Sequence, residues 1–288
     1  MSEGRGPAPA GAERSAASEV AEPPVGRETR PRSSLRAVTV PAEHGGWGLT
    51  LEPVLLGLLL APTIAGACIG LAAVVAFLAR TPLKVLLVDA HRGRELGRTR
   101  LARRVFAGEC VVLIALAATA LLVADSRFWI PLVVIGPLLT VELWFDMRSR
   151  SRRLIPELAG AIGIGGVAAV ILLAGGRSGA LAVACWLILA ARAVTAIVTV
   201  RDQVGRLHGR PGHPRQLVAA DLAAVSLAMV AVAVDGLATA GAAAVVGATV
   251  AQRLLAMRPT SRAVVLGLRQ SALGLAVVIV TVLGVITA

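Results

Sequence analysis

Residues 179–200 read GALAVACWLILAARAVTAIVTV, an apolar run that only Arg192 interrupts and that Arg201 follows directly. An α-helix rises about 1.5 Å per residue, so a run of this length matches the roughly 30 Å hydrocarbon core of a bilayer. The stretch therefore predicts a membrane-spanning helix. The fold depends on how often such stretches recur in the rest of the chain.

Similar apolar runs recur on both sides of this stretch, with short polar breaks between them. They cover residues 46–63, 66–88, 105–124, 128–146, 155–175, 217–234, 237–257 and 265–287. With 56% apolar and 16% charged residues, the chain has more apolar surface than one soluble domain can bury. We therefore expect an all-α, polytopic membrane helical bundle over residues 39–288, with about nine transmembrane helices. The boundary after residue 234 is the weakest, because only Asp235-Gly236 marks it.

Residues 1–38 have a different composition, rich in Ala, Pro, Ser and charged residues and without apolar periodicity. Such a segment cannot bury enough surface to offset the entropy lost on ordering, so we expect a disordered tail. The net charge of +12 does not indicate nucleic-acid binding, since the arginines lie in short clusters between apolar runs rather than on one face.

The basic clusters alternate with the predicted helices. One set of segments holds most Arg residues, namely 5–36, 92–104, 148–153, 201–215 and 258–262, whereas the alternate loops hold only Arg127 and Arg177. Lys and Arg are enriched in the cytoplasmic loops of membrane proteins. The alternation therefore predicts a protein of the cytoplasmic membrane with a cytoplasmic N-terminal tail and an external C-terminus.

Ionisable residues inside the predicted helices lie near one side of the membrane, within about two helical turns of the cytoplasmic boundary. They are Glu52, Arg80, Glu109, Glu142, Glu157, Arg192, Asp221, Arg253 and Arg269. A charge in hydrocarbon is costly, so such residues usually line a functional cavity or pair with one another. Their shared depth predicts a polar pocket open to the cytoplasm. The alternative is that they reach the headgroups or pair locally, as Glu157 could with Arg153.

The entry to the first helix, Pro41-Ala-Glu-His-Gly-Gly-Trp-Gly48, combines Glu43 and His44 with glycines that permit close backbone approach. Together with Thr81-Pro-Leu-Lys84, Arg98-Thr-Arg100 and the stretch 149–157, this motif resembles the YwiC-like membrane proteins of bacteria. The resemblance spans about residues 38–288 and implies location rather than activity.

The helix count and the two long polar loops also resemble the UbiA-type intramembrane prenyltransferases. That family holds magnesium and a prenyl diphosphate with Asp-rich motifs in those loops. Here Asp89 stands nine residues before Arg98, as in the family, but the preceding Asn-Asp pair falls on Val85 and Leu86. Asp202 stands alone in the second loop. Magnesium is the cofactor that the resemblance implies, although arginines could hold a diphosphate without it.

We therefore expect a UbiA-like bundle whose cytoplasmic pocket binds a prenyl lipid, a quinone or an isoprenoid phosphate; any enzymatic activity would be of the prenyltransferase type. The candidate acid–base groups are Glu43, His44, Glu52, Asp89 and Asp202. The candidate ligand contacts are Lys84, Arg98, Arg192, Arg201, Glu142 and Glu157. Two alternatives remain open: a proton-coupled transporter that uses the intramembrane carboxylates, and a non-catalytic membrane scaffold.

Overall fold

The computed structural model describes residues 44–124, 128–148, 153–257 and 262–288. The regular elements in these ranges are helices, which confirms the all-α prediction. The predicted N-terminal tail and Glu43 lie outside the described residues. The helices, in chain order, are α2 (His44–Leu60), α3 (Ile64–His91), α4 (Gly97–Val123), α5 (Leu132–Met147), α6 (Leu154–Gly165), α7 (Val167–Ala174), α8 (Gly179–Leu207), α9 (Pro214–Val234), the 3₁₀ turn η1 (Gly236–Ala238), α10 (Thr239–Ala256) and α11 (Ala263–Thr287).

Seven helical segments in the described ranges are long and apolar enough to cross a membrane: α3, α4, α6 with α7, α8, α9, η1 with α10, and α11. The chain is therefore a multi-pass membrane protein. The other two predicted spans correspond to α2, with 17 residues, and α5, with 16. Because both are shorter than the seven, the predicted count of nine is not confirmed.

The boundary between α9 and α10 is clear in the structure. Asp235 ends α9, and its carboxylate accepts a hydrogen bond from the Leu237 backbone N–H at 3.0 Å. A 3₁₀ turn then leads directly into α10. The short Asp-Gly sequence therefore separates two helices, because Asp caps the new turn and Gly does not extend the old helix.

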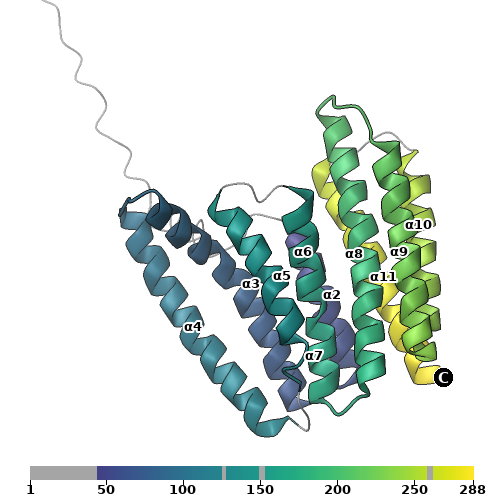
Figure 1. Cartoon of the computed structure of the whole chain (residues 1–288), viewed down its shortest axis with the longest axis horizontal. Helices are drawn as coiled ribbons and strands as arrows, with labels where there is room; N and C mark the ends of the chain where they lie inside the picture. The colour runs from purple at the N-terminus through teal and green to yellow at the C-terminus, as the bar shows by residue number, and fades with distance from the viewer. Residues whose placement is uncertain (1–43, 125–127, 149–152, 258–261) are drawn as a thin grey trace, which may run out of the picture.

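Helix α8 lies inside the bundle, between α6 and α7 on one side and α9 and α10 on the other (Figure 1). It is the most buried of the seven spans, with 72% of its apolar stretch inside the protein. Its buried face is rich in alanine, and Cys185 lies on it as a small apolar residue. Small side chains let neighbouring helices approach closely, which lets α8 contact several helices at once.

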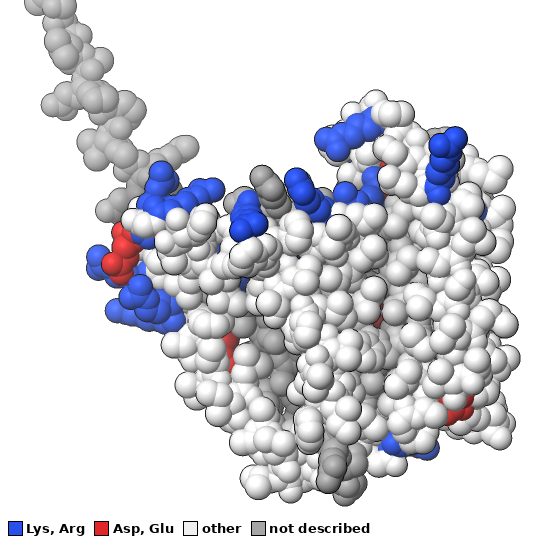
Figure 2. Space-filling model, in the orientation of Figure 1, with Lys and Arg blue, Asp and Glu red and all other residues white. Residues whose placement is uncertain are grey.

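The basic residues gather at one end of the bundle. The connections α3–α4 and α8–α9 lie at this end, whereas α7 and α8 are joined at the other (Figure 1). Lys and Arg side chains line the same edge in the space-filling view (Figure 2). We call this edge the basic end. The grouping agrees with the alternation of basic segments in the sequence; the side of the membrane it faces remains a prediction.

Candidate functional site

The first charged cluster lies between α3 and α5. Asp146 is fully buried, and its carboxylate accepts hydrogen bonds from Arg80 Nε at 3.0 Å and from Lys84 Nζ at 3.3 Å. Arg80 also forms an ion pair with Glu142, at 2.8 Å. Two predicted ligand contacts, Lys84 and Glu142, therefore belong to one cluster that joins α3 to α5.

Glu142 fits between α5 and α6 because residue 160 is a glycine. A Cβ atom at Gly160 would overlap the Glu142 carboxylate. At Gly166 a Cβ would lie 2.7 Å from the Ile135 side chain and 2.9 Å from Trp186. The glycines of this helix therefore serve close packing, and one of them makes room for a charged group.

The second cluster joins the end of α3 to the start of α4. Asp89 is buried and accepts hydrogen bonds from Arg98 Nη2 at 3.0 Å and from Thr99 Oγ1 at 2.6 Å. The nine-residue spacing between Asp89 and Arg98 thus has a structural consequence, since it places both partners across a tight helix–helix connection.

The next clusters lie around the basic ends of α8 and α9. Arg201 forms an ion pair with Glu157 of α6 at 2.8 Å. Asp202 forms an ion pair with Arg206 at 2.7 Å and accepts a hydrogen bond from the backbone N–H of His213 at 2.8 Å. Asp202 therefore holds the α8–α9 connection in place.

A deeper cluster joins α8, α9 and α10, and its residues are not among the predicted site residues. Arg253 donates to both carboxylate oxygens of Asp221, at 2.7 Å and 2.6 Å, and Thr195 donates to the same carboxylate at 2.9 Å. The sequence places Asp221 and Arg253 at a similar distance from the predicted cytoplasmic boundary, but nothing in it indicates that they are partners.

The pair between Glu52 of α2 and Arg192 of α8 differs from the others. Arg192 is 1% exposed and Glu52 is 7% exposed. Arg192 Nη2 lies 3.7 Å from Glu52 Oε1, beyond hydrogen-bonding range, and donates instead to the backbone carbonyl of Gln270 at 2.6 Å. Arg192 Nε and Nη1 are buried without a hydrogen-bond partner among the described residues. Two of the three guanidinium nitrogens of Arg192, Nε and Nη1, could therefore donate to a ligand.

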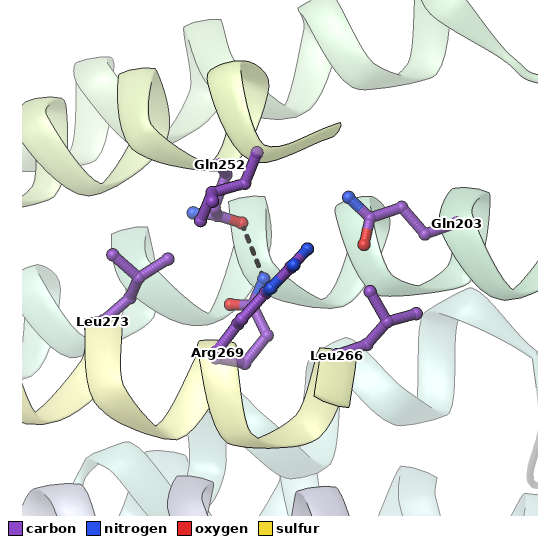
Figure 3. Close-up of a pocket in the computed structure, with 7 residues that line it drawn as sticks. Gln203, Gln252, Leu266, Arg269 and Leu273 are labelled. Atoms are coloured by element: carbon purple, nitrogen blue, oxygen red, sulfur yellow. Dashed lines mark hydrogen bonds between the residues drawn. The ribbon is translucent and has the colours of Figure 1, made fainter. Parts of the chain in front are cut away.

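A small polar cavity lies between α8, α10 and α11 (Figure 3). Arg192 and Glu52 do not line it, but Gln270, whose backbone carbonyl accepts from Arg192, does. Gln270 Nε2 donates to Gln252 Oε1 at 3.3 Å, the bond drawn as a dashed line in Figure 3. Gln252 Nε2 and Gln270 Oε1 are buried and have no hydrogen-bond partner within the described ranges. The volume of about 10 Å³ holds about one water molecule. The lining residues are Gln203, Gln252, Leu255, Leu266, Arg269, Gln270 and Leu273.

The three glutamines at this cavity escape sequence reasoning because a neutral amide does not stand out as an ionisable group does. The available signal was their position, since Gln252 and Gln270 occur within largely apolar helices, each beside an arginine. A buried amide needs partners for both its ends, so it also indicates a polar interior.

The predicted site residues thus lie in separate pairs between different helices. The side chain of His44, at the start of α2, and the whole of Glu43 lie outside the part of the chain that the structure describes. In the described part of the chain, no three His, Cys, Asp or Glu side chains are grouped so that they could hold a metal ion. The magnesium implied by the UbiA resemblance therefore finds no ligand set among these residues.

The fold and its buried charges define a multi-pass helical membrane protein with polar groups between its helices. Residues 40–172 match the family model described as YwiC-like protein. The matched range includes the entry motif from Pro41 onward and the Asp89 and Asp146 clusters, and it supports the YwiC-like part of the resemblance. No curated protein and no solved structure matches the chain. The likeness to UbiA-type enzymes therefore stays a prediction.

Proposed function

We propose that this chain is a multi-pass protein of the cytoplasmic membrane that binds the polar head of an amphipathic ligand. The head would enter from the basic end, which faces the cytoplasm, and reach Arg192 through the cavity between α8, α10 and α11. The ligand classes are an isoprenoid phosphate, another prenyl lipid or a quinone. The observation that carries the proposal is the buried Arg192 guanidinium with two unpartnered donors.

The chemistry of Arg192 favours a ligand with several oxygen acceptors. A buried donor without a partner costs free energy, on the order of 1–3 kcal/mol. Nε and Nη1 point to different edges of the planar guanidinium, whereas the paired edge is formed by Nε and Nη2, as in the Arg253–Asp221 pair. A phosphate oxygen or a quinone carbonyl would therefore accept from one of the two unpartnered nitrogens, and a second oxygen or a water molecule would accept from the other.

The cavity must enlarge to admit such a head, because a volume of about 10 Å³ holds only about one water molecule. The Gln270–Gln252 hydrogen bond, at 3.3 Å, links α11 to α10 across it. Breaking this bond would make the Gln270 Nε2 donor and the Gln252 Oε1 acceptor available to the ligand. Binding therefore involves a small separation of α10 from α11.

The remaining candidate residues support the ligand indirectly in this proposal. Arg98 and Arg201 each have a carboxylate partner, and Lys84 pairs with Asp146, so they would attract anionic heads to the basic end rather than hold them. Glu52 is the carboxylate nearest Arg192 and the candidate acid–base group if a reaction follows binding. Catalysis by Glu43, His44, Asp89 or Asp202 also stays a prediction.

Thermal unfolding of the detergent-purified protein tests the proposal. We expect farnesyl diphosphate to raise the melting temperature without magnesium, and a prenyl alcohol to raise it much less. Arg192→Lys keeps the charge but loses the Nε and Nη1 donors, and should weaken the shift in melting temperature. Gln252→Leu should weaken it as well. Arg103→Lys is the matched control, because Arg103 is exposed and pairs only weakly, at 3.4 Å, with Glu95.

Each other outcome has a defined meaning. A shift that requires both diphosphate and magnesium would favour the prenyltransferase mechanism with the metal bound outside the described clusters. A shift with a quinone alone would select the neutral ligand. The absence of any shift would overturn the proposal and favour the transporter, which accumulation of a labelled substrate in proteoliposomes would then detect, or the scaffold.

A further inference from the structure

We infer that Glu52 is an internal competitor for Arg192, so that an anionic head binds Arg192 only together with the uptake of one proton by the Glu52 carboxylate. This inference rests on the proposed function and adds its regulation by pH. It commits the ligand to a phosphate or another anion rather than a quinone. The proton comes from water on the basic side, and the carboxylate becomes a neutral carboxyl group.

The geometry shows that Glu52 holds Arg192 loosely. The closest approach, 3.7 Å between Oε1 and Nη2, is an ionic contact without a hydrogen bond. Nε and Nη1 of the same guanidinium have no hydrogen-bond partner in the described part of the chain. An incoming phosphate that accepts from either nitrogen would therefore displace no existing hydrogen bond, but it would meet the charge of Glu52.

The charge balance then requires a proton. Arg192 and Glu52 together are neutral, and both are nearly fully buried. An added anion would leave a net negative charge in the interior of a membrane protein, where an uncompensated charge is strongly unfavourable. Protonation of Glu52 restores neutrality for a singly charged head. Arg269, which lines the cavity, can offset one further charge of a diphosphate.

The other charged groups on the helices packed around α2 already have partners or lie at the cavity. On α3, Arg80 and Lys84 are bound to Asp146, and Asp89 is bound to Arg98. On α6, Glu157 is bound to Arg201 of α8, and α7 carries no charged residue. Arg269 is the remaining charged residue on the described part of α11. None of these has a recorded contact with Glu52, which leaves Arg192 as its charged partner among the described residues.

A route for the proton follows the same polar groups. Gln270 links Arg192 to the cavity, since its carbonyl accepts from the guanidinium and its amide bonds to Gln252. Gln203 and Arg269 continue the polar lining (Figure 3). A water molecule in this cavity can carry the proton as far as Gln270, which contacts Arg192, while the amides hold the water by hydrogen bonds and do not themselves carry the proton.

The test measures proton uptake on binding. Titration calorimetry of the full chain, in two buffers of different ionisation enthalpy, would use a farnesyl methyl phosphodiester, which carries one fixed charge near neutral pH. We expect uptake of about one proton and an affinity that falls about tenfold per pH unit while Glu52 is ionised in the free protein. Glu52→Gln should bind without proton uptake and with little pH dependence. Glu95→Gln, at an exposed surface pair, should behave like the wild type.

The outcomes separate this inference from the proposed function. Wild-type binding without proton uptake, or proton uptake that persists in Glu52→Gln, would overturn the inference while leaving the ligand site intact. No binding by either protein would overturn the proposed function itself. If Glu52→Gln does not fold, the wild type still tests the inference, because binding without proton uptake would overturn it. Dimethyl phosphate carries the same charge without the prenyl chain. Binding of both compounds would indicate that a free phosphate ester suffices, and binding of the farnesyl compound alone would indicate a lipid head.

Discussion

Gly274 of α11 lies directly against the carboxylate of Glu52 in α2, so closely that a Cβ atom at residue 274 would overlap Glu52 Oε1. The absence of a side chain at this position is what allows the acidic group to lie between the two helices opposite Arg192. The same relationship holds between Gly160 and Glu142. In both places a glycine on one helix makes room for a carboxylate on its neighbour.

Gly274→Ala should therefore destabilise the protein by about 1–3 kcal/mol, because the added methyl group displaces the Glu52 carboxylate or separates α2 from α11. The measurement is thermal unfolding in detergent. Gly267→Ala is the control on the same helix, since a Cβ there meets no atom within 4 Å. Equal melting temperatures for the two variants would contradict the close contact.

Asp146→Asn should be more damaging than Glu157→Gln. Asp146 is fully buried and pairs with both Arg80 and Lys84, whereas the Glu157 side chain is 32% exposed in its pair with Arg201. Removing one partner of a buried ion pair costs on the order of 3 kcal/mol, but an exposed pair contributes roughly 1 kcal/mol or less. Denaturant titration of both variants would measure the difference. A loss for Glu157→Gln as large as that for Asp146→Asn would contradict the burial of the α3–α5 cluster.

Asp89→Asn should lower the melting temperature with or without magnesium, because Asp89 holds the start of α4 through Arg98 and Thr99. A metal ligand would behave differently, since its replacement would mainly abolish stabilisation by added magnesium. Glu95→Gln provides the control in the same connection, where both partners of the ion pair are mostly exposed. Stability that is unchanged in Asp89→Asn but no longer responds to magnesium would argue against the structural role.

A reporter fused after Ala288 should be active outside the cell, and one placed after His208 should be active inside. These outcomes follow if the basic end faces the cytoplasm, because the three spans α9, η1 with α10, and α11 separate residues 208 and 288. Activity of both fusions on the same side would contradict this arrangement of the three spans. The two shorter helices need their own reporters: fusions after residues 128 and 148 should lie on opposite sides if α5 crosses, and an N-terminal reporter should lie opposite to one after residue 61 if α2 crosses.

The sequence predicts the helices well because each is a long apolar run between polar breaks, a pattern that depends only on the local chain. The same reasoning places Glu52, Arg192 and Asp221 within about two helical turns of the predicted cytoplasmic boundary. It cannot predict partners, because Asp146 pairs with residues more than 60 positions earlier, and that pairing depends on which faces of α3 and α5 meet. The predicted lengths are also too long for α2, which ends at Leu60 rather than at residue 63, and for α5, which begins at Leu132 rather than at residue 128.

The candidate site was predicted only in part. Arg192 stood out because a charge within an apolar run is rare, but its spare donors depend on the 3.7 Å distance to Glu52 and on a carbonyl from α11. The role of Gly274 was also hidden, since a glycine in a membrane helix looks the same whether it faces lipid, another helix or a carboxylate. Such features belong to the packing of distant segments.

Helix α4 has only 6% of its apolar stretch inside the protein, against 72% for α8, and it packs chiefly on α3. Most of its surface therefore meets acyl chains rather than protein. A change in bilayer thickness acts on a helix through the mismatch between its apolar length and the hydrocarbon core, and neighbouring helices oppose the resulting tilt. Thickness will therefore tilt α4 before it disturbs α8, which makes the α3–α4 pair the part of the protein most responsive to lipid composition.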